Sequence, residues 1–247
     1  MRFKNKVALV TGGNSGIGLG VAKAFAREGA AVAITGRDDA TLASAARSIG
    51  GETLAIQADV SKLSDIDAAM GRIKERFGRI DAMFVNAGAG KFVPFDQVTE
   101  AFYDELMAVN LKGLFFTVQK ALPLMQPGSS VVLNASLNAH KRMPGTTVYG
   151  ATKAAVVNLA RTMSADLIPR GIRVNSVSPG PIESSLLKRL GMTQEQLQQT
   201  NDWIKSQVPL KRFGTPEEIA EAVLFLCSPG GGFVVGADLL VDGGMAL

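Results

Sequence analysis

Short apolar runs alternate along the chain with longer segments whose apolar residues recur at helical spacing. The short runs are apolar throughout rather than at every second position, which is typical of parallel strands buried on both faces. Strands and helices that alternate in this way predict a doubly wound α/β fold, with a parallel sheet of about seven strands flanked by helices. The predicted strands are residues 7–11, 31–35, 53–57, 80–85, 130–135, 173–177 and 239–241, and the predicted helices are residues 17–28, 39–48, 61–78, 100–122, 149–168 and a last helix from 216.

Capping residues support two of the predicted helix starts. Asp38 or Asp39 can cap the second helix, and Thr215 can cap the last one because a proline and two glutamates follow it. Residues 178–214 show no regular pattern, and no linker, repeat or low-complexity segment divides the chain. We therefore expect one domain, residues 1–247.

The composition argues against a nucleic-acid-binding protein. The 247 residues are 47 % apolar and 19 % charged, which is typical of a globular protein, and the net charge is only +4. The basic pairs at 141–142, 188–189 and 211–212 are scattered rather than gathered into a stripe. We expect them to form a solvated surface or a basic rim for an anionic ligand.

The single cysteine, Cys227, excludes an intrachain disulfide and offers no metal cluster. It lies in an apolar run, so we expect a buried structural thiol. No apolar stretch approaches the roughly 18 residues of a membrane span, and the chain opens without a signal-peptide pattern. We therefore expect a cytoplasmic protein with no metal and no membrane partner.

The stretch TGGNSGIG, residues 11–18, joins the first predicted strand to the first predicted helix. A pyrophosphate needs a backbone that approaches closely and a helix N-terminus aimed at the phosphates. Gly12 allows the tight turn, Gly16 removes a Cβ at the helix start, and Gly18 allows close packing of helix and strand. Asn14 and Ser15 can donate to phosphate. A bare structural turn is the alternative interpretation.

The end of the second strand indicates which dinucleotide binds. An NAD site usually has an acid there, which bonds the ribose 2′-hydroxyl. Here Gly36 and Arg37 occupy that place, and a guanidinium can bind a 2′-phosphate through two hydrogen bonds. We therefore predict NADP(H) rather than NAD(H), with a solvent-facing Arg37 as the alternative.

The order of these motifs resembles the short-chain dehydrogenase/reductase family over essentially the whole chain. The family's turn has the form Thr-Gly-x-x-x-Gly-x-Gly, which residues 11–18 match. The resemblance implies a Rossmann fold in which the Asn-Ala-Gly motif at 86–88 supports the sheet beside the cofactor. It also implies that Asp59 and Val60 hold the adenine ring, and that the segment from Pro179 faces the nicotinamide. The residues expected to bind the cofactor are Gly12, Asn14, Ser15, Gly16, Ile17, Gly18, Arg37, Asp59, Val60, Asn86, Ala87, Gly88, Tyr149, Lys153, Pro179, Gly180, Ile182 and Ser184.

Tyr149 and Lys153 are four residues apart on a predicted helix and so share one face. Ser136 ends the fifth predicted strand, at the sheet edge where ligands of such folds bind. Reduction of a ketone needs a proton at oxygen, and a free tyrosine, with a pKa of about 10, exchanges it poorly unless a nearby ammonium lowers that value. The resemblance implies that Tyr149 is the general acid/base, that Lys153 lowers its pKa and binds the nicotinamide ribose, that Ser136 holds the substrate oxygen, and that Asn110 anchors a proton-relay water.

The resemblance also places a variable substrate lid at residues 181–207, which contain several apolar side chains. We expect Asn138, His140 and Leu186 to be substrate contacts. His140, the only histidine, lies just after Ser136, but Tyr149 already fills the acid/base role.

The expected function is NADPH-dependent reduction of a ketone or aldehyde. A 3-oxoacyl-carrier-protein reductase is the first alternative, because the C-terminal half resembles one; residues 127–129 lack the usual basic docking residue, although Arg170 remains. A sugar dehydrogenase is the second. A regulator that senses NADP(H) is a third, and it would not need the complete Asn-Ser-Tyr-Lys set. The family is typically tetrameric, so a homotetramer is expected, with the apolar tail 244–247 at an interface.

Overall fold

A seven-stranded parallel sheet organises the chain, whose computed structural model describes residues 1–183 and 193–247. The strand order is β3-β2-β1-β4-β5-β6-β7, so the chain moves outward from β1 in one direction and then returns to build the other half from β4. This order confirms the predicted doubly wound α/β fold, and it places the topological switch point between β1 and β4. The strands are β1 Val7–Thr11, β2 Ala31–Gly36, β3 Thr53–Gln57, β4 Ile80–Val85, β5 Met125–Asn134, β6 Arg173–Pro179 and β7 Asp238–Val241.

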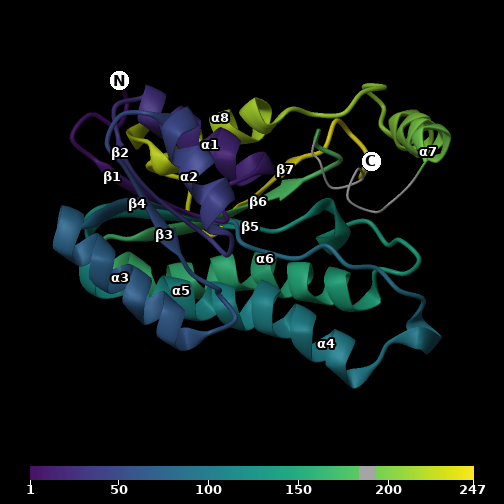
Figure 1. The fold of residues 1–247 in the computed structure, drawn as a ribbon, viewed down its shortest axis with the longest axis horizontal. Helices are drawn as coiled ribbons and strands as arrows, with labels where there is room; N and C mark the ends of the chain where they lie inside the picture. The colour runs from purple at the N-terminus through teal and green to yellow at the C-terminus, as the bar shows by residue number, and fades with distance from the viewer. Residues whose placement is uncertain (184–192) are drawn as a thin grey trace.

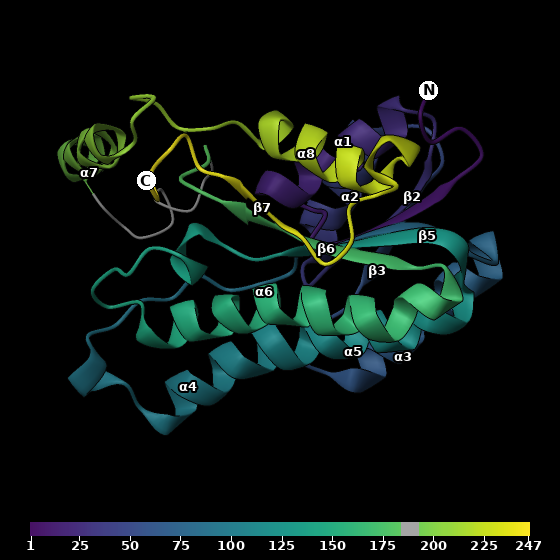
Figure 2. The same ribbon diagram turned by 180° about the vertical axis from the view of Figure 1, so that it is seen from behind.

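Helices cover both faces of the sheet, as Figure 1 shows. One buried cluster joins α3, α5 and α6 to one face, and a second joins α1, α2 and α8 to the other. Seen from behind, α7 lies beside the C-terminus and off the sheet (Figure 2). None of the helices in the described ranges is both long and apolar enough to span a membrane. The helices are α1 Gly16–Arg27, α2 Asp39–Ile49, α3 Leu63–Phe77, α4 Glu100–Met107, α5 Leu114–Ala121, α6 Thr147–Leu167, α7 Gln194–Gln207 and α8 Pro216–Cys227.

The helical region predicted over 100–122 is present, but it is not one regular α-helix. A π-helical segment, Ala108–Gly113, separates α4 from α5. The reason is packing on both sides of the segment: a Cβ on Gly113 would lie only 2.6 Å from the carbonyl oxygen of Val60, and the Asn110 side chain bonds the backbone of Ala89. An inserted residue of this kind leaves the apolar pattern almost unchanged, and π segments often lie at functional sites.

Other boundaries also differ from the sequence prediction, most by one or two residues. Strand β5 begins at Met125 rather than 130, and β6 continues to Pro179 rather than ending at 177. The region 178–214, which shows no regular pattern in sequence, contains α7. Its N-terminus is a capping box in which the side chains of Thr193 and Gln196 each bond the other residue's backbone N–H. The Thr-x-x-Gln pattern was therefore a usable signal for this helix.

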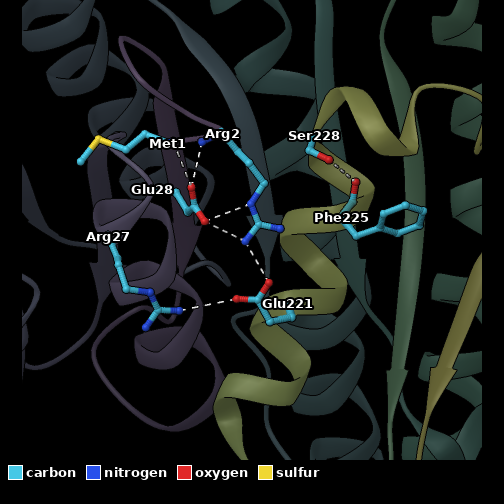
Figure 3. Close-up of polar contacts among 7 residues, drawn as sticks. All are labelled: Met1, Arg2, Arg27, Glu28, Glu221, Phe225 and Ser228. Atoms are coloured by element: carbon cyan, nitrogen blue, oxygen red, sulfur yellow. Dashed lines mark hydrogen bonds and ion pairs between the residues drawn. The ribbon is translucent and has the colours of Figure 1, made fainter.

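The N-terminal segment is attached to α1 and α8 by exposed ion pairs, drawn in Figure 3. The Arg2 guanidinium lies 3.0 Å from Glu28 and 2.9 Å from Glu221, and Arg27 reaches Glu221 at 3.6 Å. Exposed pairs of this kind contribute little to folding because water screens them. They fix the orientation of the first residues rather than supply the stability of the fold.

Arg173 makes hydrogen bonds at the C-terminal end of α8. From the start of β6 its Nη1 donates to the carbonyl oxygens of Leu226, at 2.8 Å, and Gly231, at 2.9 Å. The last carbonyls of a helix have no partner within the helix, so a cation there satisfies them and opposes the helix dipole. The neighbouring thiol of Cys227 is buried as expected, and burial raises its pKa to about 12.

We expect Arg173→Met to destabilise the protein much more than Arg2→Met. Loss of hydrogen bonds from a charged donor to partly buried carbonyls should cost about 2 kcal/mol, which lowers Tm by roughly 4–8 °C in a chain of this size. Thermal unfolding of both variants beside the wild type measures the difference. Equal decreases in Tm for the two variants would show that the Arg173 contact contributes no more to stability than the exposed pairs of Arg2.

Candidate active site

The proposed site residues meet at the carboxyl ends of four neighbouring strands. The glycine turn follows β1, Asn86 follows β4, Ser136 follows β5, and Pro179 ends β6. Parallel strands bring all these ends to one edge of the sheet, beside the switch point where ligands of doubly wound folds bind. The fold thus brings together residues that are far apart in the sequence.

The turn between β1 and α1 fits a pyrophosphate. Gly12 and Gly16 have φ of +63° and +52°, values that side chains rarely allow. A Cβ on Gly18 would lie 2.6 Å from the Asn86 amide nitrogen and even closer to the carbonyl of Gly12. A Cβ on Gly16 would meet no described atom within 4 Å, so the start of α1 faces open space. The amides of that helix end are suited to an anion.

The Asn14 side chain has a partner on α2. Its side-chain nitrogen donates to the Thr41 hydroxyl at 2.9 Å, and a Cβ on Gly36 would lie 2.7 Å from its side-chain oxygen. Asn14 therefore ties the turn to the end of β2 and to α2, and its contact with a phosphate stays a prediction. Ser15 is the residue before α1, and Ile17 packs partly against the buried cluster of α1 and α8.

Asn86 links three strands at the switch point. Its amide nitrogen donates to the carbonyls of Thr11, at 3.0 Å, and Gly12, at 3.3 Å, while its oxygen accepts from Asn134 at 2.8 Å. The Thr11 hydroxyl accepts from the backbone N–H groups of Asn86 and Ala87. Thr11 and Asn134 are thus part of the site, although the sequence prediction missed Asn134. Its polar side chain at the end of an apolar strand was the available signal.

Asp59 faces the end of β2 from the start of the α3 connection. Burial raises the pKa of its carboxyl, but hydrogen bonds from Ser61 and the positive charges of Arg37 and Lys62 outweigh burial, so its pKa lies below the ordinary value. The carboxylate accepts from the Ser61 hydroxyl at 2.7 Å. Arg37 itself is exposed, and its guanidinium is therefore accessible to a ligand at this edge.

Ser136 lies close to Tyr149. Ser136 is 8 % exposed, its hydroxyl accepts from the N–H of Asn138 at 3.1 Å, and it is near enough to the Tyr149 phenol to lower the pKa of that group. Tyr149 stands in the first turn of α6, where the Phe92 ring meets it edge to face at 5.4 Å. The phenol is held between a polar partner and an apolar neighbour.

Burial dominates the electrostatics of Tyr149 and Lys153. It raises the pKa of Tyr149, and the Ser136 hydrogen bond offsets only part of that rise. It also lowers the pKa of Lys153 to about 8. The ammonium donates to the carbonyl of Asn134 at 2.7 Å and lies 5.8 Å from the centre of the Tyr149 ring, and a lowering of the Tyr149 pKa by Lys153 stays a prediction.

Asn110 lies in the π-helical segment and is 1 % exposed. Its side-chain oxygen accepts from the N–H of Ala89 at 2.7 Å, and its nitrogen donates to the Ala89 carbonyl at 3.0 Å and to the Thr152 hydroxyl at 3.3 Å. The side chain thereby fixes the loop after β4 against α6. A Cβ on Gly88 would lie 3.2 Å from Asn110 and 3.7 Å from the Lys153 ammonium, so this loop passes close to both.

The segment after β6 is tightly packed at its start. A Cβ on Gly180 would lie 2.6 Å from the Cα of Asp242, and Ile182 forms a bridge with Gly214. Of the expected substrate contacts, Asn138 has a buried side-chain nitrogen without a partner among the described residues, and the imidazole of His140 contacts Asp238. Four residues named in the sequence prediction lie outside the described residues: Ser184, Leu186, Lys188 and Arg189.

Within residues 1–183 and 193–247, no group of three or more His, Cys, Asp or Glu side chains is arranged to hold a metal ion. The polar groups at the strand ends are mainly amides, hydroxyls and one ammonium, which suit hydrogen bonding to an organic ligand.

Residues 12–246 match the family model described as enoyl-(acyl carrier protein) reductase. The chain is 39 % identical to 2-(S)-hydroxypropyl-CoM dehydrogenase 3 of Xanthobacter autotrophicus, over 99 % of this chain and 98 % of the relative. It is 34 % identical to a 3-oxoacyl-(acyl-carrier-protein) reductase of Thermotoga maritima over 100 % of both chains. The structure of a short-chain dehydrogenase/reductase from Serratia marcescens matches with a TM-score of 0.92 and 32 % identity over 100 % of both chains.

The fold and the arrangement at the strand ends define an α/β oxidoreductase. Its matches extend over nearly the whole chain, and the chain belongs to the short-chain dehydrogenase/reductase family. The resemblance noted in the sequence is thereby confirmed. Enzymes of this family use nicotinamide cofactors, and the glycine turn, with its close approach at Gly18 and open space at Gly16, fits such a group.

Lys153→Met should change how the stability of the protein depends on pH, because it removes a buried amine whose pKa is lowered. The folded-state pKa of Lys153 lies below its unfolded value, so the unfolded chain binds the extra proton between about pH 8 and 10. The free energy of unfolding of the wild type should therefore rise relative to the variant as pH increases through that window. Urea unfolding at several pH values measures it, and a pH-independent difference would contradict the shifted pKa.

Proposed function

We propose that the chain is an NADP(H)-dependent oxidoreductase that interconverts a ketone or aldehyde and the corresponding alcohol. The observation that carries this proposal is the closeness of the Ser136 hydroxyl to the half-buried Tyr149 phenol, with the buried Lys153 ammonium 5.8 Å from the centre of the Tyr149 ring. A structural site would not need a buried hydroxyl and a buried amine beside a half-buried phenol, because each of these groups costs free energy to desolvate. Proton transfer to a carbonyl oxygen uses all three.

In this mechanism the Ser136 hydroxyl holds the substrate oxygen, and the Tyr149 phenol donates its proton to that oxygen. The Tyr149 phenol is protonated at neutral pH, as donation to a carbonyl oxygen requires. The bound nicotinamide supplies the hydride for reduction, or accepts it for oxidation. Lys153 and Asn110 hold the neighbouring backbone, and Lys153 is the charged group closest to the phenol ring.

The preference for NADP(H) rests on the charges at the end of β2. No carboxylate occupies the positions of Gly36 and Arg37, and the exposed guanidinium of Arg37 is available for a 2′-phosphate. Asn14, which donates a hydrogen bond to Thr41, packs against Gly36. Asp38 is turned away from this role, because its carboxylate accepts from the Thr41 N–H at 2.8 Å as the cap of α2.

The substrate class is proposed to be a small ketone or aldehyde, covered by a lid at residues 181–207 that includes α7. Reduction of a 3-oxoacyl group on a carrier protein is the second candidate, and the relative from Thermotoga maritima supports it. Against it, residues 127–129 offer no basic side chain, and Arg170 already donates to the carbonyl of Leu122 at 2.9 Å. A sugar dehydrogenase is a weaker candidate, and a sensor of NADP(H) would not need the buried Ser-Tyr-Lys set.

A homotetramer remains part of the proposal. Strand β7 is an edge of the sheet, and Leu239 and Leu240 on it are 38 % and 37 % exposed. Phe233 and Val235, just before it, are also exposed. Apolar edge strands are normally covered, and a second copy of the chain would cover this one.

Tyr149→Phe should abolish turnover while NADPH binding is largely retained. Loss of the proton donor should lower kcat/KM by roughly 10²–10⁴-fold, as measured by NADPH oxidation with a panel of ketones and aldehydes. The chain has two tyrosines, so Tyr103→Phe, on the exposed face of α4, is the matched control and should be fully active. Substantial reductase activity in Tyr149→Phe would refute the assignment.

Arg37→Ala should weaken NADP⁺ binding by about 10- to 100-fold, because it removes charge-assisted hydrogen bonds to the 2′-phosphate. Binding of NAD⁺ should change little. Fluorescence or calorimetric titration of both nucleotides measures this, with Arg47→Ala, an exposed arginine in the last turn of α2, as the control. Tighter binding of NAD⁺ than of NADP⁺ by the wild type would overturn the preference.

A further inference from the structure

The imidazole of His140 joins the loop after β5 to strand β7. Its Nε2 lies 2.7 Å from a carboxylate oxygen of Asp238 and 3.3 Å from the Ser178 hydroxyl. Asp238 is the first residue of β7, and Ser178 belongs to the neighbouring strand β6. The contact therefore connects a surface loop to the edge of the sheet, and nothing in the proposed chemistry of Tyr149 uses it.

Asp238 is an unusually well-fixed partner. Its side chain is only 7 % exposed, and its two oxygens accept from the Ser176 hydroxyl at 2.6 Å and from the Ser178 hydroxyl at 3.0 and 2.9 Å. Burial of a carboxylate is costly unless hydrogen bonds compensate it. Here two serines of β6 provide them, so the carboxylate is held by the sheet itself, and His140 reaches a rigid acceptor.

The loop that His140 ends is the loop that carries Ser136. The carbonyl of Ser136 accepts from the N–H of Ala139 at 2.9 Å, and that of Leu137 accepts from the N–H groups of His140, at 2.9 Å, and Lys141, at 2.8 Å. These bonds make residues 136–141 a compact turn whose parts move together. The turn is attached to β6 at its start, through the bond from the N–H of Ala135 to the carbonyl of Val177, and His140 attaches its far end.

We propose that His140 is a positioning residue, which holds the Ser136 hydroxyl and the Asn138 side chain in place by anchoring their turn to Asp238. The inference rests on the proposed function, since Ser136 matters only if it holds a substrate oxygen. The imidazole is 36 % exposed, and an exposed pair adds little to global stability. The contact instead sets the position of the Ser136 hydroxyl, and a displacement of a reacting group by about 1 Å can lower the rate up to roughly 100-fold.

Three variants test the anchor. His140→Ala removes it, His140→Gln keeps a side-chain nitrogen that can reach Asp238, and Arg142→Ala is the control, since Arg142 is exposed and forms no polar side-chain contact within the described ranges. We expect His140→Ala to lower kcat about 10-fold with the KM for NADPH and the Tm nearly unchanged. His140→Gln should recover most of the loss, and Arg142→Ala should match the wild type.

A double-mutant cycle identifies the partner. If the imidazole acts through Asp238, His140→Ala should cost little further kcat in an Asp238→Ala background, so the two losses should be far from additive. Additive losses, equal losses in His140→Ala and His140→Gln, or a kcat for His140→Ala equal to that of Arg142→Ala would each contradict the proposal.

Hydrogen exchange separates this proposal from the proposed function, because it needs no substrate. Residues 136–141 should exchange faster in His140→Ala than in Arg142→Ala, while the exchange of β5 and α6 stays the same. Unchanged exchange with an active wild type would overturn the anchor alone. A wild type that reduces no compound of the carbonyl panel would overturn the proposed function, and the exchange of this turn would still decide whether His140 anchors it.

Discussion

A single path of hydrogen bonds joins the glycine turn to the buried lysine, and the site depends on it. Lys153 donates to the Asn134 carbonyl, the Asn134 side chain donates to Asn86, and Asn86 donates to the carbonyls of Thr11 and Gly12. The path crosses from α6 to the ends of β5, β4 and β1. Because the Asn86 amide bonds two backbone carbonyls and the Asn134 side chain, loss of Asn86 would remove a partner from all three. The proposed cofactor turn and the proposed proton donor are therefore held by one structure.

The same region concentrates groups that oppose folding. Lys153 and Tyr149 are both desolvated, and their pKa values move in opposite directions, each toward the neutral form. A chain selected for stability alone would place apolar side chains there. Their presence next to Ser136 is the feature on which the proposed proton transfer rests.

The strand ends and the glycine turn of the proposed site were predictable because they follow the sheet. Apolar runs located the strands, and the glycines of residues 11–18 and the missing acid at Gly36 are local features of sequence. The π-helical segment was not predictable, since one inserted residue shifts Asn110 without disturbing the apolar pattern. The direction of the pKa shift at Tyr149 was not predictable either. The spacing to Lys153 shows that the two residues share a helix face, but it does not show how deeply they are buried, and burial decides the direction of the shift.

The substrate half is built differently, from segments that the sheet does not fix directly. Leu137 beside Ser136, Val208 after α7, and Met245 in the C-terminal tail form a small buried cluster separate from the two main cores. Lys141 adds a hydrogen bond to the carbonyl of Met245 at 2.7 Å. Three segments distant in sequence thus share one packing unit, and close packing transmits a change in any of them. Substitutions in α7 or the tail can therefore alter the position of Ser136 without touching substrate, whereas His140 and Asp238 hold the same turn to the sheet and limit that movement.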